Sequence, residues 1–224
     1  MPILSVITPT TGDPSLSKLM DSLYAQDIDF EHILLWDDKR NGHCEPEGIC
    51  AINGWTKTYS IVIPGKIVQG IAAGSALRSV GLMAAKGKYV TFADSDVWQE
   101  PNHFQNLLKL VSNAQWGFCR RKIWDSKNEY LGVDNFESVG NSSEKKVPYT
   151  LVDNNTVIFE RRFGSSAAVL YRETTEYNDD RLMTAFLYKY AGEPGVSKEA
   201  TINQVCPERL ENMFRENCTK QIGT

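Results

Sequence analysis

The chain has 224 residues, of which 42% are hydrophobic and 23% are charged, as is usual for a globular protein of one large domain or two small ones. Its net charge of -4 gives no reason to expect nucleic acid as a partner, and it shows neither a long apolar run nor a basic, apolar leader that would predict a membrane span or a signal peptide. The 5 scattered cysteines favour free thiols in a reducing compartment, so we expect a cytoplasmic protein that associates with membranes at most peripherally.

Strands and helices are expected to alternate through the first half of the chain. Apolar runs predict strands over residues 3–8, stopped by Pro9, and over residues 30–36, 59–63 and 89–93. Apolar residues at helical spacing predict helices over residues 14–25, where Asp13 is the expected N-cap, from Ser75 to a left-handed cap at Gly87, and over residues 104–111. Such alternation favours an α/β fold with a mostly parallel sheet and helices on both faces.

After about Trp116 the pattern changes. Strands are expected over residues 116–123, 156–161 and 167–171 without helices between them, and residues 125–149 are polar and expected to be irregular. Helical spacing returns with Met183 and Leu187, and a strand over residues 201–205 and a helix over residues 207–218 follow. No repeat or linker divides the chain, so a single domain is the simpler interpretation.

Two predicted strands end in paired acidic residues. Asp94 and Asp96 follow the strand over residues 89–93, and Asp37 and Asp38 follow the strand over residues 30–36. Ligands of parallel sheets bind at the carboxyl ends of strands, where these carboxylates are expected to lie. Neighbouring carboxylates repel each other and suit a hard cation such as Mn²⁺ or Mg²⁺, which usually also binds substrate phosphates. The alternative interpretation of Asp94-Ser95-Asp96 is a solvated turn.

Several sequence blocks, in order, resemble glycosyltransferases with the GT-A fold, most closely the large family 2 group. LSVITPT, ILLWDD and ALRSVGLMAAKGKYVTFADSD resemble the nucleotide-sugar half, with Ser79 in place of the usual asparagine. FGSSAAVLYRE resembles the acceptor-side strand, and YNDDRLMTAFLYKYAG resembles the segment with the catalytic acid pair. The resemblance covers about residues 4–192. It implies one GT-A domain, with a nucleotide-sugar half over about residues 1–112 and a small antiparallel, acceptor-side half over about residues 113–224.

The resemblance also implies roles for individual residues. The nucleotide-sugar donor would be bound by Thr8, Pro9, Thr10, Asp37, Asp38, Arg78, Asp94 and Ser95. Among these, Asp37 would meet the uracil edge, Arg78 the base or diphosphate, and Asp94 the ribose. Asp96 would hold the metal, with Asp94 as a second candidate ligand. Asp180, with Asp179 beside it, falls where the family places its general base.

The expected reaction is a metal-dependent transfer of one sugar from a nucleoside-diphosphate sugar, with UDP favoured, to an acceptor hydroxyl. Negative charge builds on the leaving diphosphate, which a cation offsets, while a carboxylate takes the proton of the attacking hydroxyl. A single displacement of this kind inverts the anomeric carbon. The acceptor is a glycan, a lipid-linked hydroxyl or a protein-linked hydroxyl. No histidine follows His103, although many members of the family use a late histidine as a metal ligand.

Two other functions stay open at this point. A nucleotidyltransferase that makes an activated sugar shares the parallel sheet but usually has a glycine-rich, basic loop after the first strand, whereas TPTTGDP has one glycine and no Lys or Arg. A non-catalytic module that binds nucleotide sugars or glycans is the other alternative. Asp179 and Asp180 have an alternative interpretation as helix N-cap residues, and Arg78 as a surface residue.

The remaining polar residues of interest are expected to have no catalytic role. His32 is expected to be packed within its strand, and His103 to be exposed at the start of a helix. The spacing of His43, Cys44 and Cys50 fits no standard zinc site. The glycosylation sequons at Asn141, Asn154 and Asn217 are interpreted as chance matches.

Overall fold

A computed structural model describes residues 1–12, 14–37, 56–63, 73–135, 138–139, 151–173 and 179–219. The predicted cap at Asp13, the residue Asp38, the loop over residues 39–54 and the His43–Cys44–Cys50 group therefore lie outside the described residues. Among the described residues, no helix is long and apolar enough to cross a membrane.

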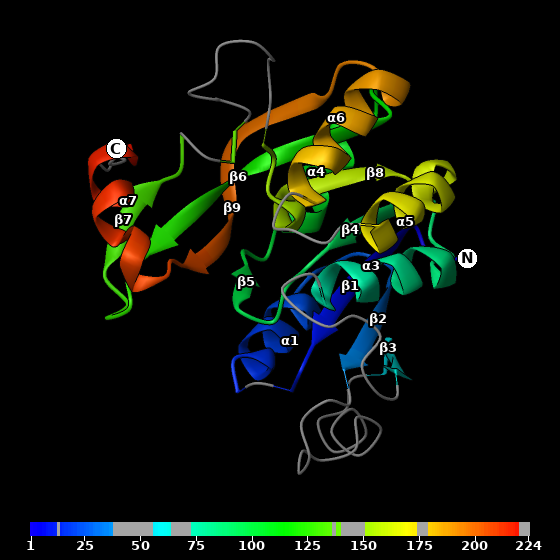
Figure 1. Cartoon of the computed structure of the whole chain (residues 1–224), viewed down its shortest axis with the longest axis horizontal. Helices are drawn as coiled ribbons and strands as arrows, with labels where there is room; N and C mark the ends of the chain where they lie inside the picture. The colour runs from blue at the N-terminus through cyan, green and yellow to red at the C-terminus, as the bar shows by residue number, and fades with distance from the viewer. Residues whose placement is uncertain are drawn as a thin grey trace.

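The centre of the fold is a nine-stranded sheet with the order β3-β2-β1-β4-β8-β6-β9-β5, and β7 pairs with β6 (Figure 1). The strands are β1 Leu4–Thr10, β2 Phe30–Asp37, β3 Thr58–Ile63, β4 Tyr89–Phe92, β5 Val97–Gln99, β6 Trp116–Trp124, β7 Tyr130–Val133, β8 Val157–Glu160 and β9 Gly195–Val205. β3, β2, β1 and β4 are parallel to one another, as are β6 and β9. The other pairings, made by β5, β7 and β8, are antiparallel. The predicted mostly parallel α/β sheet with an antiparallel portion is confirmed.

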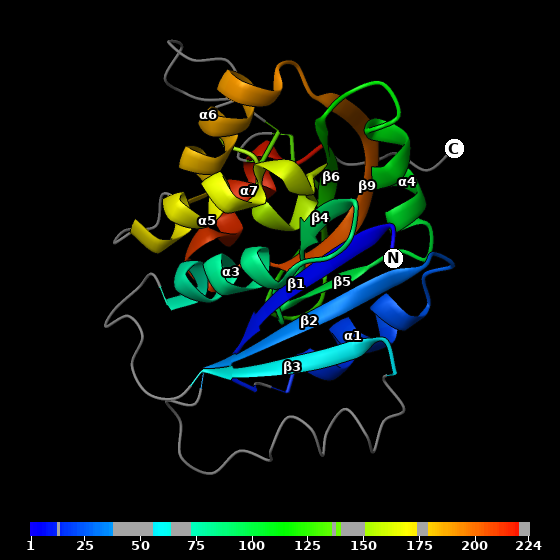
Figure 2. The ribbon, with the colours of Figure 1, turned by 90° about the vertical axis from the view of Figure 1, so that its right-hand side faces the viewer.

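Helices cover both faces of the sheet. They are α1 Leu16–Tyr24, α3 Ala73–Ala84, α4 His103–Leu110, α5 Gly164–Glu173, α6 Asp179–Ala191 and α7 Glu211–Asn217, with short 3-10 turns η1 Asn154–Thr156, η2 Arg161–Phe163 and η3 Glu208–Leu210. Apolar side chains of α1 and α4 pack with Leu4, Val6 and Leu34 on one face. Those of α3, α5 and α6 pack with Ile7 and Leu35 on the other (Figure 2).

The first half of the chain folds largely as predicted, with two corrections. β1 continues through Pro9 to Thr10, because β4 accompanies β1 only as far as Ile7 and the missing N–H of the proline costs no bond to β4. Gly87 is not a left-handed cap, since its φ is not positive. A Cβ on Gly87 would lie 2.6 Å from the backbone nitrogen of Ser5, so this glycine is required by close contact between two backbones.

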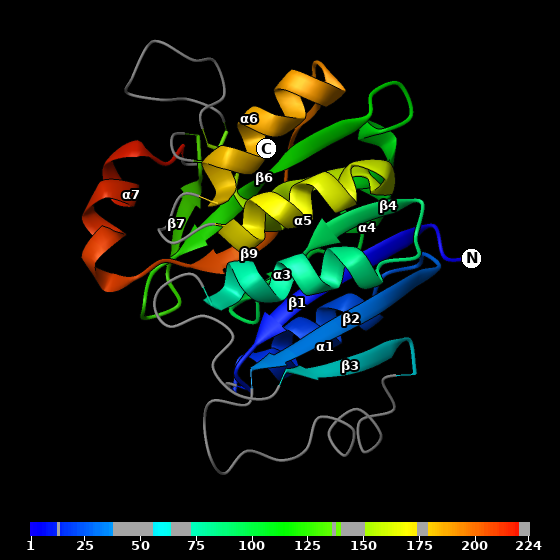
Figure 3. The same ribbon diagram turned by 45° about the vertical axis from the view of Figure 1, so that its right-hand side comes forward.

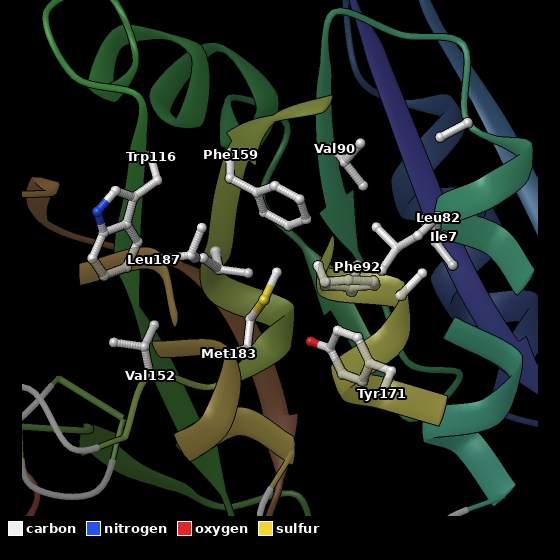
Figure 4. Close-up of a cluster of buried hydrophobic side chains, with 14 of the residues drawn as sticks. Ile7, Leu82, Val90, Phe92, Trp116, Val152, Phe159, Tyr171, Met183 and Leu187 are labelled. Atoms are coloured by element: carbon white, nitrogen blue, oxygen red, sulfur yellow. The ribbon is translucent and has the colours of Figure 1, made fainter. Parts of the chain in front are cut away.

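The segment over residues 167–171 is a helix, α5, and the predicted strand is wrong. Ala167, Ala168 and Tyr171 are buried while Val169 is 46% exposed, which is the spacing of a helix face and not the alternation of a strand. The small residues let α5 lie directly beside α3 (Figure 3). Figure 4 shows Tyr171 in the core next to Phe92 of β4, with a ring-centroid distance of 5.5 Å.

Two further differences concern the second half of the chain, and a third concerns His103 at the start of α4. The polar stretch expected to be irregular contains β7, which pairs with β6 across a bulge. β9 extends from Gly195 and is longer than the strand predicted over residues 201–205. The expected exposed position of His103 is also wrong, because its ring is fully buried and its Nδ1 lies 2.8 Å from the hydroxyl of Thr201.

His32 joins the three parallel strands β1, β2 and β3. Its ring is fully buried, as predicted, and its two nitrogens lie 2.9 Å from the hydroxyls of Thr8 and Thr58. Burial lowers the pKa of His32 to about 3, and burial likewise lowers the pKa of His103 to about 3. Both rings are therefore neutral in the folded protein at physiological pH.

These two imidazoles are expected to make the protein less stable in acid. In the unfolded chain each of these histidines takes up a proton near pH 6.5, whereas the buried ring in the folded protein does not. Each histidine therefore lowers the free energy of unfolding by up to about 1.4 kcal/mol for every pH unit below 6.5. Urea denaturation at pH 7.5 and pH 5.5 measures the loss. His32→Gln, which cannot titrate, should lose about 1 kcal/mol less than the wild type over this interval. An equal loss in both proteins would contradict this account.

Candidate functional site

A cleft of about 390 Å³ lies at the carboxyl ends of the parallel strands. It is lined by Pro9, Thr10, Thr11, Asp37, Gly74, Leu77, Arg78, Asp94, Ser95 and Asp96. These residues come from the ends of β1 and β2, the first turns of α3 and the loop between β4 and β5. The cleft thus brings together the predicted donor residues, apart from Thr8 and the undescribed Asp38. It occupies the sheet edge at which open α/β folds bind ligands.

Thr8 does not line this cleft. Its side chain is fully buried in β1, and its hydroxyl lies 2.9 Å from Nε2 of His32. The next two residues, Pro9 and Thr10, reach the cleft because β1 continues to its end there. A role for Thr8 in direct contact with a ligand is therefore not supported by its position.

Arg78 connects the cleft to the second half of the chain. Its Nη2 donates to Oδ1 of Asp94 at 2.5 Å and its Nη1 donates to Oδ2 of Asp179 at 3.2 Å, with 10% of the arginine side chain exposed. Burial alone would lower the pKa of Arg78, but the carboxylates of Asp94 and Asp179 outweigh burial and raise that pKa above its ordinary value. Arg78 is thus a permanently charged bridge, not the surface residue of the alternative interpretation.

Asn155 binds the backbone of Asp94 and the carboxylate oxygen of Asp94 that Arg78 does not bind. The Oδ1 of Asn155 accepts from the backbone N–H of Asp94 at 2.6 Å, and its Nδ2 donates to Oδ2 of Asp94 at 3.2 Å. The same Nδ2 donates to Oδ1 of Asp153 at 2.9 Å. Asn155 is only 2% exposed, so these bonds are formed away from water and fix the conformation of the loop after β4.

Asn154 makes the matching contacts to the acid pair on α6. Its Nδ2 donates to Oδ2 of Asp179 at 3.4 Å, and its Oδ1 accepts from the hydroxyl of Tyr171 at 2.5 Å. Sequence reasoning missed both asparagines as parts of the site and noted Asn154 only as a sequon. The signal in the sequence was the polar run Asp153-Asn154-Asn155, which comes directly before a buried strand. Side chains at the start of that strand lie at the same edge of the sheet as the cleft.

Asp179 and Asp180 lie in the first turn of α6, where carboxylates interact favourably with the helix dipole. Asp179 accepts from the hydroxyl of Ser75 at 2.8 Å as well as from Arg78. Asp180 instead lines a second cavity, beside Asp153. Burial, followed by the charges of Asp153 and Asp179, raises the pKa of Asp180 well above its usual range. The two neighbouring aspartates therefore have different environments.

The carboxylates of the cleft fit a divalent cation that arrives with a diphosphate. Both carboxylate oxygens of Asp94 accept hydrogen bonds, from Arg78 and Asn155, and the side chain of Asp96 is exposed to solvent. In the part of the chain that the structure describes, no three His, Cys, Asp or Glu residues form a preformed metal cluster. Mg²⁺ and similar ions are commonly held by one or two carboxylates, with substrate phosphates and water as further ligands.

Comparison with known proteins connects this geometry to sugar transfer. No protein-family model matches the chain. Glycosyltransferase GlyA of Streptococcus pneumoniae serotype 4 is 34% identical over 189 residues, which cover 83% of this chain. The chain is homologous to part of a glycosyltransferase. It spans only about a quarter of the length of that relative, 24%.

Solved structures share the fold. S. aureus TarS, residues 1–349, in complex with UDP has a TM-score of 0.63 at 18% identity, over 95% of this chain and 69% of that TarS fragment. The same TarS fragment in complex with UDP-GlcNAc has a TM-score of 0.59 at 20% identity. The match covers 92% of this chain and 59% of the other. The mannosyltransferase PcManGT from Pyrobaculum calidifontis, in complex with GDP-Man and Mn²⁺, has a TM-score of 0.61 at 16% identity. That match covers 96% of this chain and 60% of PcManGT. The match to GlyA confirms the predicted relationship to glycosyltransferases, and the solved structures confirm the predicted fold.

Removal of the Asn155 amide is expected to destabilise the folded protein. Asn155→Ala leaves the backbone N–H of Asp94 and the buried carboxylate of Asp153 without this partner, which should lower the free energy of unfolding by about 2–3 kcal/mol. Asn102→Ala is the matched control, because Asn102 is exposed at the start of α4 and its side chain makes no capping bond. The control should change stability by less than about 0.5 kcal/mol. Equal stabilities of the two variants in urea would refute the bridging role of Asn155.

Proposed function

We propose that the chain is a metal-dependent glycosyltransferase domain of the GT-A type, similar to family 2. It would move one sugar from a nucleoside-diphosphate sugar, with UDP favoured, to an acceptor hydroxyl with inversion. The observation that carries this proposal is the cleft in which Asp37, Arg78 and Asp96 converge at the carboxyl ends of parallel strands. Its support is the shared fold with proteins solved in complex with UDP-GlcNAc and GDP-Man.

The donor is proposed to lie in this cleft, with its base toward the ends of β1 and β2. Pro9, Thr10 and the buried Asp37 would contact the base and ribose. Asp96 would hold Mn²⁺ or Mg²⁺, which when bound would offset negative charge on the leaving diphosphate. Arg78 is proposed as a positioning residue, since its guanidinium is already paired with Asp94 and Asp179.

Asp180 is proposed as the general base. A carboxylate whose pKa is raised has a greater affinity for the proton of an attacking hydroxyl than an ordinary aspartate has. The proton would move to the Asp180 carboxylate as the acceptor oxygen attacks the anomeric carbon. Asp180 lies outside the lining of the cleft that is proposed to hold the donor. The acceptor oxygen is therefore expected to attack from the side opposite to the leaving group. Such an attack inverts the anomeric carbon.

The raised pKa of Asp180 predicts the sign of the pH dependence. Only the ionised carboxylate accepts a proton, so kcat should fall as pH decreases through that raised pKa, at a higher pH than for an ordinary aspartate. Initial rates at saturating donor and acceptor, measured between pH 5 and pH 9, test this expectation. A rate that stays constant down to pH 5 would argue against Asp180 as the base.

Asp96→Ala is expected to weaken the metal-dependent binding of nucleotide sugars by at least about 10-fold, because the exposed carboxylate of the cleft is lost. Thermal shifts with UDP-GlcNAc, UDP-Glc and GDP-Man, each with Mn²⁺ or with EDTA, measure the binding. Asp27→Ala is the control, since Asp27 is exposed before β2, at the opposite edge of the sheet. Binding that is equal in both variants and insensitive to EDTA would contradict the proposed metal site.

Asp180→Asn is expected to lower kcat by about 10²- to 10⁴-fold, while donor affinity stays close to that of the wild type. The same change should leave the melting temperature at pH 7.5 unchanged or higher, because an ionised carboxylate with a raised pKa destabilises the folded state at that pH. Asp21→Asn on the exposed side of α1 is the control. Full turnover by Asp180→Asn would eliminate the proposed base.

A further inference from the structure

A second cavity, of about 410 Å³, lies on the other side of the acid pair from the donor cleft. Its walls come from β6, β9, η3 and α7, and from the turn and helix start that carry Asp153 and Asp180. The family resemblance implied an acceptor-side half over about residues 113–224 but named no residue of the C-terminal helix as part of a site. Phe214 of α7 does pack, with Ile123 and Leu131, but together with Leu210 it also closes one side of this cavity.

Each of the two neighbouring aspartates is associated with a different one of the two spaces. Asp179 is held by Ser75 and Arg78, both on α3 beside the donor cleft. Asp180 is the member of the pair that lines the second cavity. A general base must lie within hydrogen-bond reach of the hydroxyl that it deprotonates. A hydroxyl that is activated by Asp180 therefore has to enter this cavity.

The charges around the cavity are balanced. The Nε of Arg121 donates to Asp134 at 2.8 Å, and its Nη1 donates to Asp153 at 2.6 Å. The same Nη1 donates to Oε1 of Gln204 at 2.6 Å. Two carboxylates and two guanidiniums line the space, those of Asp153, Asp180, Arg121 and Arg209. With no excess of either sign, this lining favours an uncharged ligand.

The walls also combine two kinds of surface. Polar groups of Asp153, Asp180 and Gln204 form one part, and apolar side chains such as Leu210 and Phe214 form another. A sugar ring has hydroxyl groups around its edge and an apolar C–H face, which match such a lining. An acyl chain would leave the buried polar groups without partners. An extended peptide would call for an open groove or a free sheet edge.

We propose that this cavity binds the terminal, uncharged sugar of a glycan acceptor, with the nucleophilic hydroxyl toward Asp180. This inference rests on the proposed function and specifies its acceptor. The acceptor O–H bond breaks and its proton passes to the Asp180 carboxylate. The acceptor oxygen forms a bond to the anomeric carbon, and the bond from that carbon to the diphosphate breaks with its electron pair leaving on the diphosphate.

Leu210→Trp, which fills the cavity, tests the proposal. Ligand-observed NMR would measure the binding of methyl glycosides of neutral hexoses and N-acetylhexosamines in the presence of UDP or GDP and Mn²⁺. The wild type should bind at least one glycoside, and Leu210→Trp should bind it at least about 10-fold more weakly. Asn212→Trp, on the exposed side of the same helix, should bind like the wild type. Leu151→Phe, in a different part of the lining, gives a second test if Leu210→Trp does not fold.

Three outcomes overturn the inference: no glycoside bound by the wild type, undiminished binding by the folded cavity variants, or binding only of a serine peptide or a polyprenyl phosphate used as comparison ligands. Nucleotide-sugar binding is measured on the same samples by thermal shift. If the wild type binds no nucleotide sugar, the proposed function fails. If it binds nucleotide sugars but no glycoside, only the acceptor assignment fails.

Discussion

The ion pairs of Arg78 with Asp94 and Asp179 are the interaction on which the proposed site depends. They join α3 to the loop after β4 and to the start of α6, residues that are 16 and 101 positions away from Arg78 in the chain. A buried guanidinium between two carboxylates is stable only while both partners remain, because a lone buried charge is strongly destabilising. The side chain of Arg78 therefore connects the proposed donor cleft directly to the acid pair on α6.

The η1 turn reinforces this arrangement from the other side of the sheet edge. Asn155 binds the loop that carries Asp94, Asn154 binds Asp179, and Asp153 lines the second cavity together with Asp180. Uncharged amides suit this position because they bind carboxylates without adding charge. Asn155 thus links Asp94, which lines the proposed donor cleft, to Asp153, which lines the proposed acceptor cavity. A transfer between two bound substrates requires two such sites to be held in a fixed arrangement.

The sequence predicted the first half of the fold well, because its strands are long apolar runs and its helices have clear apolar spacing. It also predicted that Asp37, Asp94 and Asp96 would converge, since parallel strands end at the same edge, and the family resemblance placed Arg78 with them. It did not predict α5, whose small residues and Val-Leu-Tyr run resemble a strand until the partner helix α3 is known. The asparagines of η1 were missed because their role comes from contacts with residues distant in the chain, such as the 61 positions between Asn155 and Asp94.

The central claim is that the aspartate pair separates a donor cleft from an acceptor cavity. A crystal structure of the protein with UDP or GDP, Mn²⁺ and a bound methyl glycoside tests this claim most directly. The account predicts the nucleotide against Asp37 and the metal at Asp96, with a glycoside hydroxyl within about 3 Å of the Asp180 carboxylate or joined to it by one water. A nucleotide bound elsewhere, or a glycoside on the Arg78 side of the pair and out of reach of Asp180, would contradict it.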